Sequence, residues 1–101
     1  LDTLARRHPT NADYRIELYT ALGALRSALA AAGRPDSALA VGRRAAAGHE
    51  ALLAADPRNA ILRRNLAVSL RAHGRDLLAA GRTAEALGAH RRSHAITDSL
   101  L

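Results

Sequence analysis

The feature that most constrains the fold of this chain is an internal repeat with a period of 48 residues. An ungapped offset of 48 aligns the sequence with itself over most of its 101 residues. Matches of Ala and Leu carry little weight in a chain so rich in both, but matches of rarer residues are informative. They pair Pro9 with Pro57, Asn11 with Asn59, Gly33-Arg34 with Gly81-Arg82, and Arg43-Arg44 with Arg91-Arg92. A fixed period of this kind indicates repeated supersecondary units.

Each repeat unit is predicted to form two helices. Apolar residues recur three or four positions apart, which is the spacing of one helix face. In the first unit these are Tyr14, Leu18, Leu22, Leu25 and Leu29, and in the second Leu62, Leu66, Leu70, His73 and Leu77. Thr10 or Asn11 in the first unit, and Asn59 in the second, can cap the first helix.

A Gly-Arg pair ends the first helix of each unit, and the second helix follows at once. Pro35 suits the first turn of that helix in one unit, and Thr83 suits its N-cap in the other. The second helices carry the apolar residues Ala38, Leu39, Ala45, Leu52 and Leu53, matched by Ala86, Leu87, Ser93, Leu100 and Leu101. Because the connection is so short, the two helices of a unit are predicted to be antiparallel.

Composition favours the same all-α fold. The apolar residues are mostly Ala and Leu, without Phe, Trp, Met or Cys, and Ala, Leu and Arg are strong helix formers. We expect one domain over 1–101, in which 1–9 is the tail of a preceding helix, 10–56 the first helical hairpin and 57–101 the second. Since helical patterns run up to both ends, the chain is expected to be part of a longer protein.

The residues at the turns and in the second helices resemble the tetratricopeptide repeat family. That pattern has a small residue, a turn glycine, Ala-Leu, an aromatic, a small residue and a final Pro. It is followed by Gly74, Gly81, Ala86-Leu87, His90 and Ser93, and in the first unit by Gly33, Ala38-Leu39, Gly42, Ala45 and Pro57. Two features depart from it. Gly42 and His90 replace the aromatic residue, and the period of 48 exceeds the usual 34 by about two turns, or ~7 residues, in each helix.

The resemblance implies a fold and a function. The fold is a set of antiparallel helical hairpins stacked as an α-solenoid, here a fragment of a right-handed superhelix. The function is that of a protein–protein interaction scaffold. Long-helix repeats of this sort are similar to those of bacterial regulators and of bacterial serine/threonine kinases, and the bias toward Ala, Leu and Arg also favours a bacterial source.

No catalytic site, cofactor or metal is predicted. The chain has no Cys, its carboxylates are dispersed, and it lacks a phosphate-binding loop, a dinucleotide fingerprint and a kinase motif. His90 and His94 lie one helical turn apart, but Arg91 and Arg92 between them repel a cation. We expect instead that His90 fills the aromatic position and packs against His73, and that protonation below about pH 6 weakens the fold.

The candidate binding surface is the first helix of each unit, which the resemblance places on a concave groove. The family's groove positions fall here on Thr20, Gly23, Ser27 and Ala31, and on Val68, Arg71, Arg75 and Ala79. Arg64 shares a helix face with the last group, and guanidinium groups bind carboxylates through bidentate contacts. The predicted site is therefore Ser27, Arg64, Val68, Arg71 and Arg75, and the predicted ligand is another protein or an acidic peptide.

Other interpretations stay open. The arginine face is also compatible with exposure to water or with cover by a neighbouring repeat. The net charge of +6 suits a basic adaptor for nucleic acid or another polyanion, although no nucleic-acid-binding motif accompanies it. Uncapped repeat ends suit a self-associating module or homo-oligomer. No apolar run reaches the ~20 residues of a membrane span, and a cytoplasmic location is favoured, with an extracytoplasmic one if the parent protein carries a span.

Overall fold

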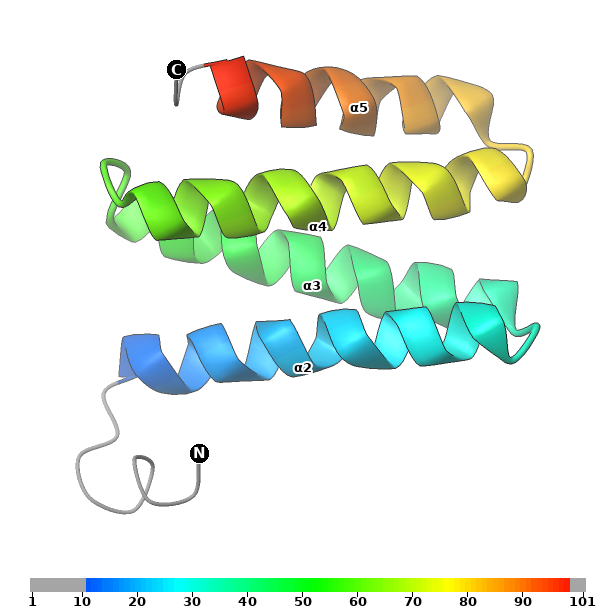
Figure 1. Ribbon diagram of the computed structural model, residues 1–101, viewed down its shortest axis with the longest axis horizontal. Coiled ribbons are helices and arrows are strands. Elements are labelled where there is room, and N and C mark those ends of the chain that lie inside the picture. Colours follow the sequence, from blue (N-terminus) through cyan, green and yellow to red (C-terminus); the bar gives the residue numbers. More distant parts are fainter. Residues whose placement is uncertain (1–10, 99–101) are drawn as a thin grey trace.

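The computed structural model describes the backbone of residues 11–98 and the side chains of residues 13–98, and it is all-α, as predicted. Four helices follow one another: α2 (Asn11–Ala31), α3 (Pro35–Ala55), α4 (Ala60–Ala79) and α5 (Thr83–Asp98). Neighbouring helices run antiparallel in the order α2, α3, α4, α5 (Figure 1). The predicted tail over 1–9, the caps proposed at Thr10 and Asn11, and the apolar residues Leu100 and Leu101 lie outside the residues so described.

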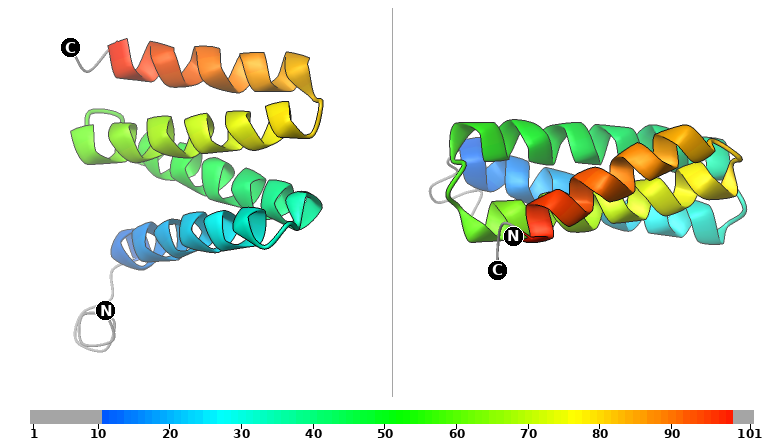
Figure 2. Two further views of the ribbon diagram at one scale, coloured as in Figure 1. Left: turned by 45° about the vertical axis from the view of Figure 1, so that its right-hand side comes forward. Right: turned by 90° about the horizontal axis from the view of Figure 1, so that it is seen from above.

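The molecule is a thin slab, 44 × 33 × 17 Å, in which helices pack mainly against their neighbours along the chain. Seen from above, α3 lies on one side of the slab and α4 on the other, while α5 crosses α4 obliquely (Figure 2). The three extensive helix contacts are α2 with α3, α3 with α4 and α4 with α5. Residues far apart in sequence therefore meet mainly where helices that follow one another in the chain pack together.

The two hairpin turns have the same hydrogen-bond pattern at equivalent positions. At the first turn, the amide of Gly33 donates to Ala30 over 3.2 Å and that of Arg34 donates to Leu29 over 2.9 Å. The second turn repeats this arrangement with donors Gly81 and Arg82 and acceptors Leu78 and Leu77. Both glycines have positive φ, 74° and 79°, as the residue that closes this type of helix end requires. The predicted Gly-Arg helix stops are confirmed.

Two of the predicted helix starts are also confirmed. The side-chain oxygen of Asn59 accepts from the amides of Ile61 and Leu62, at 3.0 and 3.2 Å. Pro35 is the first residue of α3, where a missing amide hydrogen costs no hydrogen bond.

The predicted N-cap at Thr83 is wrong by one position. Thr83 is the first residue of α5, and the carbonyl of Arg82 already accepts from the amide of Ala86. In the first unit Arg34 accepts from Ala38 in the same way. The Schellman-type turn fixes the backbone here, so the second helix starts directly after the Gly-Arg pair whatever side chain follows.

The core lies in α3, α4 and α5. Its buried apolar side chains are Ala38, Leu39, Ala45, Ala46, Leu52, Leu62, Leu66, Ala67, Leu77, Ala86 and Ile96. Among them, Leu66 is fully buried in a cluster with Ala67 and Ile96. The hydroxyl of Ser93 is buried as well and donates to the carbonyl of Ala67 over 2.8 Å, which ties α5 to α4.

The apolar stripe of the first unit is less buried than its equivalent in the second. Leu62 is 5% exposed, whereas its equivalent Tyr14 is 57% exposed, and Leu25 is 47% exposed. Tyr14 and Leu25 of the predicted stripe are therefore exposed. The reason is that α4 packs between α3 and α5, while α2 packs mainly on α3 within the described residues.

The two hairpins fill equivalent spaces with side chains of exchanged size. At Gly48 of α3, an added Cβ would lie 2.2 Å from the ring of Tyr19 on α2, so only glycine leaves room for that ring. The equivalent positions in the second unit hold Ala67 on α4 and Ile96 on α5, which share a buried cluster. The large residue is on the first helix in one unit and on the second helix in the other.

The same exchange of large and small residues occurs at a second pair of equivalent positions. The Arg26 side chain lies over Gly42, with its Cδ 3.3 Å from the Cβ position, and the His90 ring lies over Gly74 at 2.9 Å. Arg26 is equivalent to Gly74, and Gly42 to His90. Two independent pairs of this kind show that the two hairpins share one packing geometry.

The predicted packing of His90 against His73 is replaced by two separate contacts. His90 rests on Gly74, while Nδ1 of His73 lies 3.1 Å from the Cβ position of Gly42 on α3. Consecutive residues of a helix point about 100° apart. His73 therefore faces the preceding helix, and Gly74 faces the following one.

Candidate functional site

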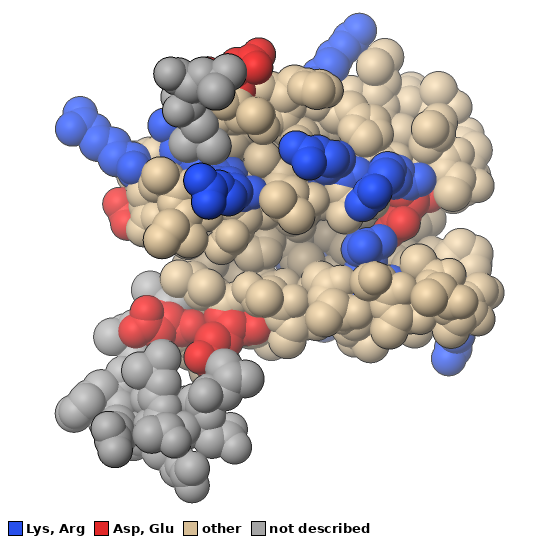
Figure 3. Space-filling view, viewed as in Figure 1, with Lys and Arg blue, Asp and Glu red and all other residues tan. Residues whose placement is uncertain are grey.

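A groove of about 320 Å³ lies between α2 and α4, with α3 as its floor. In the space-filling view, the surface is hollowed between α2 and α4, and arginine side chains gather along α4 above the hollow (Figure 3). The groove is lined by Tyr19, Thr20, Gly23 and Arg26 of α2, Ala45 and His49 of α3, and Arg64, Asn65, Val68, Ser69 and Ala72 of α4. We call this hollow the α2–α4 groove.

The structure brings two of the five predicted site residues into this groove. Arg64 and Val68 line it, and so do Thr20 and Gly23, two of the positions placed by family resemblance. The three other predicted residues, which are Ser27, Arg71 and Arg75, are exposed and lie outside the lining.

The exposed arginines of α4 form a row that begins at the groove. Arg64, Arg71 and Arg75 are all exposed on the same helix. At 1.5 Å per residue, they span about 16 Å along the helix axis. A ligand that enters the groove beside Arg64 can therefore meet further guanidinium groups along α4.

An ion pair that the sequence did not reveal joins the two walls of the groove. Nη1 of Arg26 on α2 donates to a carboxylate oxygen of Asp76 on α4 over 2.7 Å, and both side chains are mostly buried. Arg26 is equivalent to Gly74 and Asp76 to Ala28, so the pair is not repeated and the internal repeat gives no signal for it. The charge of Arg26 is already matched by Asp76, so Arg64 is the lining arginine that is available to a ligand.

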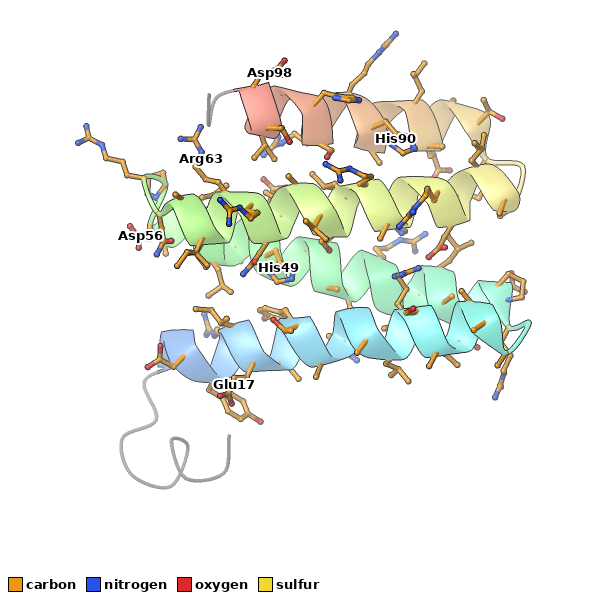
Figure 4. All side chains as sticks on the ribbon, in the orientation of Figure 1. Glu17, His49, Asp56, Arg63, His90 and Asp98 are labelled. Carbon is orange, nitrogen blue, oxygen red and sulfur yellow. The ribbon has the colours of Figure 1, made fainter. Side chains whose placement is uncertain are left out.

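His49 is the buried polar residue of the groove. It is 6% exposed, and its ring lies edge-on to the Tyr19 ring with 5.8 Å between centroids. Nδ1 of His49 is buried without a hydrogen-bond partner, and burial lowers the pKa of the imidazole below 6.5. Figure 4 shows His49 in the space between α2 and α4.

His73 has a similar environment just outside the groove. Its Nδ1 is also buried without a partner, and its pKa is lowered first by burial and then by the positive charge of Arg43. Asp76 and Glu85 act in the opposite direction, and Arg82 lowers the pKa further. Both histidines are therefore favoured in the neutral form.

The sequence predicts the arginines of α4 as site residues, but it does not predict that Tyr19 and His49 line the groove. The relevant signal was present in the repeat. Tyr19 is equivalent to Ala67 and Gly48 to Ile96. The repeat therefore pairs a large residue with a small one in both units, with the large residue on α2 opposite a glycine in the first. His49 follows Gly48 directly, yet its equivalent is Thr97, and the repeat alone gives no reason to place it in a groove.

Within residues 11–98, no three side chains from His, Asp and Glu are grouped so that they could share a metal ion. None of the four described helices is both long enough and apolar enough to pass through a membrane.

Comparison of the chain with models of protein families, with curated proteins and with solved structures finds no match.

Proposed function

We propose that this chain is a helical repeat module of the tetratricopeptide type that binds an acidic segment of another protein in the α2–α4 groove. The observation that carries the proposal is the groove itself. It combines an apolar hollow with the exposed guanidinium group of Arg64, and further exposed arginines continue from it along α4.

The repeat architecture supports the first part of the proposal. The two hairpins share their turn geometry at Gly33 and Gly81, and helices pack mainly on their chain neighbours. Such one-dimensional packing is what a solenoid requires, because each unit buries its apolar face against the next. The sequence adds the Ala-Leu, small-residue and final Pro pattern of the family.

The chemistry of the groove supports the second part. Val68, Ala72 and the ring of Tyr19 give apolar contact, while Asn65 and Arg64 give hydrogen-bond donors at the same place. A segment that alternates carboxylates with apolar side chains matches both. Charge-assisted contacts from arginine to carboxylate are the strongest hydrogen bonds available at an exposed surface.

Titration with a defined peptide tests this proposal. The probe is a labelled peptide of alternating Glu and Leu, compared with the same peptide carrying Gln in place of Glu. We expect the Glu peptide to bind more tightly, and Arg64→Glu and Arg71→Glu each to weaken it about tenfold or more, since a charged hydrogen bond contributes about 1.5–3 kcal/mol. Binding is followed by fluorescence anisotropy.

Arg91→Glu is the matched control, because Arg91 is exposed on α5, away from the groove, and the change in net charge is the same. We expect it to leave peptide affinity nearly unchanged. Equal losses of peptide affinity in the Arg64 and Arg91 variants would mean that only net charge matters. That result would contradict binding in the α2–α4 groove. In that case a random-sequence DNA duplex, bound with steep salt dependence, would favour the polyanion adaptor instead.

A further inference from the structure

The first and last described helices expose apolar side chains whose repeat equivalents pack against a neighbouring helix inside the molecule. The repeat makes α2 equivalent to α4, and α5 equivalent to α3. Leu39 on α3 is 6% exposed and lies in a buried cluster with Leu77 of α4, whereas its equivalent on α5, Leu87, is 48% exposed. Leu25 on α2 is 47% exposed, although its equivalent His73 is packed against α3.

Two exposed residues of opposite charge occupy the repeat equivalents of an ion pair inside the molecule. An ion pair between Arg92 and Glu50 links α5 to α3 inside the molecule. The repeat equivalents of these residues are Arg44 on α3 and Asp98 at the end of α5, and both are exposed. If one further unit were added in register, a residue equivalent to Glu50 would lie beside Arg44.

We propose that a second copy of this chain places its α5 against α2, in the arrangement by which α3 packs on α4. Leu87 of one copy then packs on Leu29 of the next, His90 lies against Leu25, and Asp98 of the first copy faces Arg44 of the second. The internal α3–α4 interface provides the template, so the occupant of the α2 face is identified by the repeat itself.

One position of this interface differs from the template. At the α3–α4 interface Gly42 lies against His73, and the equivalent pair between copies is His90 with Leu25. The ring of His90 is directed onto Gly74 of its own hairpin. Leu25 is also shorter than the histidine it replaces.

The two surfaces are different, so the association is head-to-tail. Each added copy leaves one α2 face and one α5 face open, and such interfaces grow into chains unless a rotation closes them. The mass in solution should therefore increase with concentration above the 10.7 kDa of one chain.

Complementary variants test this prediction. Leu25→Glu places a charge on the α2 face, and Leu87→Glu places a charge on the α5 face. Because both residues are exposed, neither change disturbs the core. By light scattering from micromolar to millimolar protein, we expect the wild type to grow, and each variant alone to remain a monomer. An equimolar mixture of the two should form a dimer and stop there, since only one intact pair of faces is present.

Leu78→Glu is the control, because Leu78 is equally exposed but belongs to neither proposed face. It should associate as the wild type does, and so should Arg71→Glu, the variant expected to weaken peptide binding, which separates the two predictions. Circular dichroism checks that every variant is folded. A wild type that stays monomeric at all concentrations would overturn the proposal and indicate that residues 1–10 or another protein cover α2. A mixture that fails to pair would overturn it too.

Discussion

At the scale of single residues, the two histidines with a buried Nδ1 atom are the most consequential side chains of the described structure. His49 and His73 each have a buried Nδ1 without a hydrogen-bond partner, and burial lowers the pKa of both. A buried imidazole that lacks a partner is tolerated in the neutral form, but charging it requires desolvation of a cation. The fold thus depends on the protonation state of these two imidazoles.

We predict that the protein loses stability as the pH falls through 6.5. Because the pKa of His49 and of His73 in the folded state lies below 6.5, the unfolded chain takes up protons first. Stability is complete above 6.5, declines below it, and levels off once the pH is below the lowered values. Thermal melts at pH 7.5 and 5.5 measure the difference.

Substitution of His49 and His73 tests whether these two residues cause the pH dependence of stability. His49→Gln combined with His73→Leu, the residue found at the equivalent Leu25, should flatten it. His94→Gln is the control, since His94 is exposed and should leave the dependence intact. An equal fall in melting temperature in the double variant would argue that other groups are responsible.

At the scale of helices, the two hairpins solve the same packing problem with exchanged side chains. Tyr19 on α2 meets Gly48 on α3, whereas Ala67 on α4 is matched by Ile96 on α5. Close-packed interiors leave few voids larger than a water molecule, so a large residue on one helix needs a small one opposite. The exchange shows that the spacing of paired helices is maintained, although the residues that fill it differ.

We predict that Gly48→Ala destabilises the protein by about 1–3 kcal/mol, because its Cβ overlaps the Tyr19 ring. In a Tyr19→Ala background the same change should cost little, since alanine favours a helix over glycine by up to about 1 kcal/mol. Urea unfolding of the four proteins of this cycle measures the coupling.

Gly88→Ala is the matched control for this experiment. No atom lies within 4 Å of a Cβ built at Gly88 on α5, so the alanine is expected to stabilise the helix by about 0.5–1 kcal/mol. If Gly48→Ala were equally harmless in the presence of Tyr19, the close packing of α2 on α3 would be wrong.

At the scale of the whole molecule, the two hairpins are joined by the α3–α4 interface and by ion pairs between their described residues. Arg92 of α5 pairs with Glu50 of α3, and a second pair spans the groove. Arg26 and Asp76 connect α2 to α4, which otherwise contact each other little. Both side chains are mostly shielded from water, so loss of one partner leaves a charge poorly solvated. This pair spans the two helices that form the walls of the α2–α4 groove.

We predict that Asp76→Asn destabilises the protein by about 1–3 kcal/mol. The control is Glu85→Gln, which breaks the exposed pair of Glu85 with Arg82 and should cost less than about 1 kcal/mol. Chemical unfolding gives both values, and hydrogen exchange should show faster opening of α2 in the Asp76 variant alone. Equal effects of the two changes would mean that the cross-groove pair adds nothing beyond a surface contact.

Much of this architecture follows from the sequence alone. The 48-residue period, the Gly-Arg helix stops and the cap at Asn59 act through local backbone geometry, which a sequence displays directly. The features that only the tertiary structure decided depend on which helices pack against each other. Tyr14 and Leu62 are equivalent in the repeat, yet one is exposed and the other buried, because α4 has a helix on each side and α2 packs mainly on one. The groove, the pairing of Arg26 with Asp76 and the burial of His49 arise from contacts between helices that differ from unit to unit, and a repeat pattern cannot encode them.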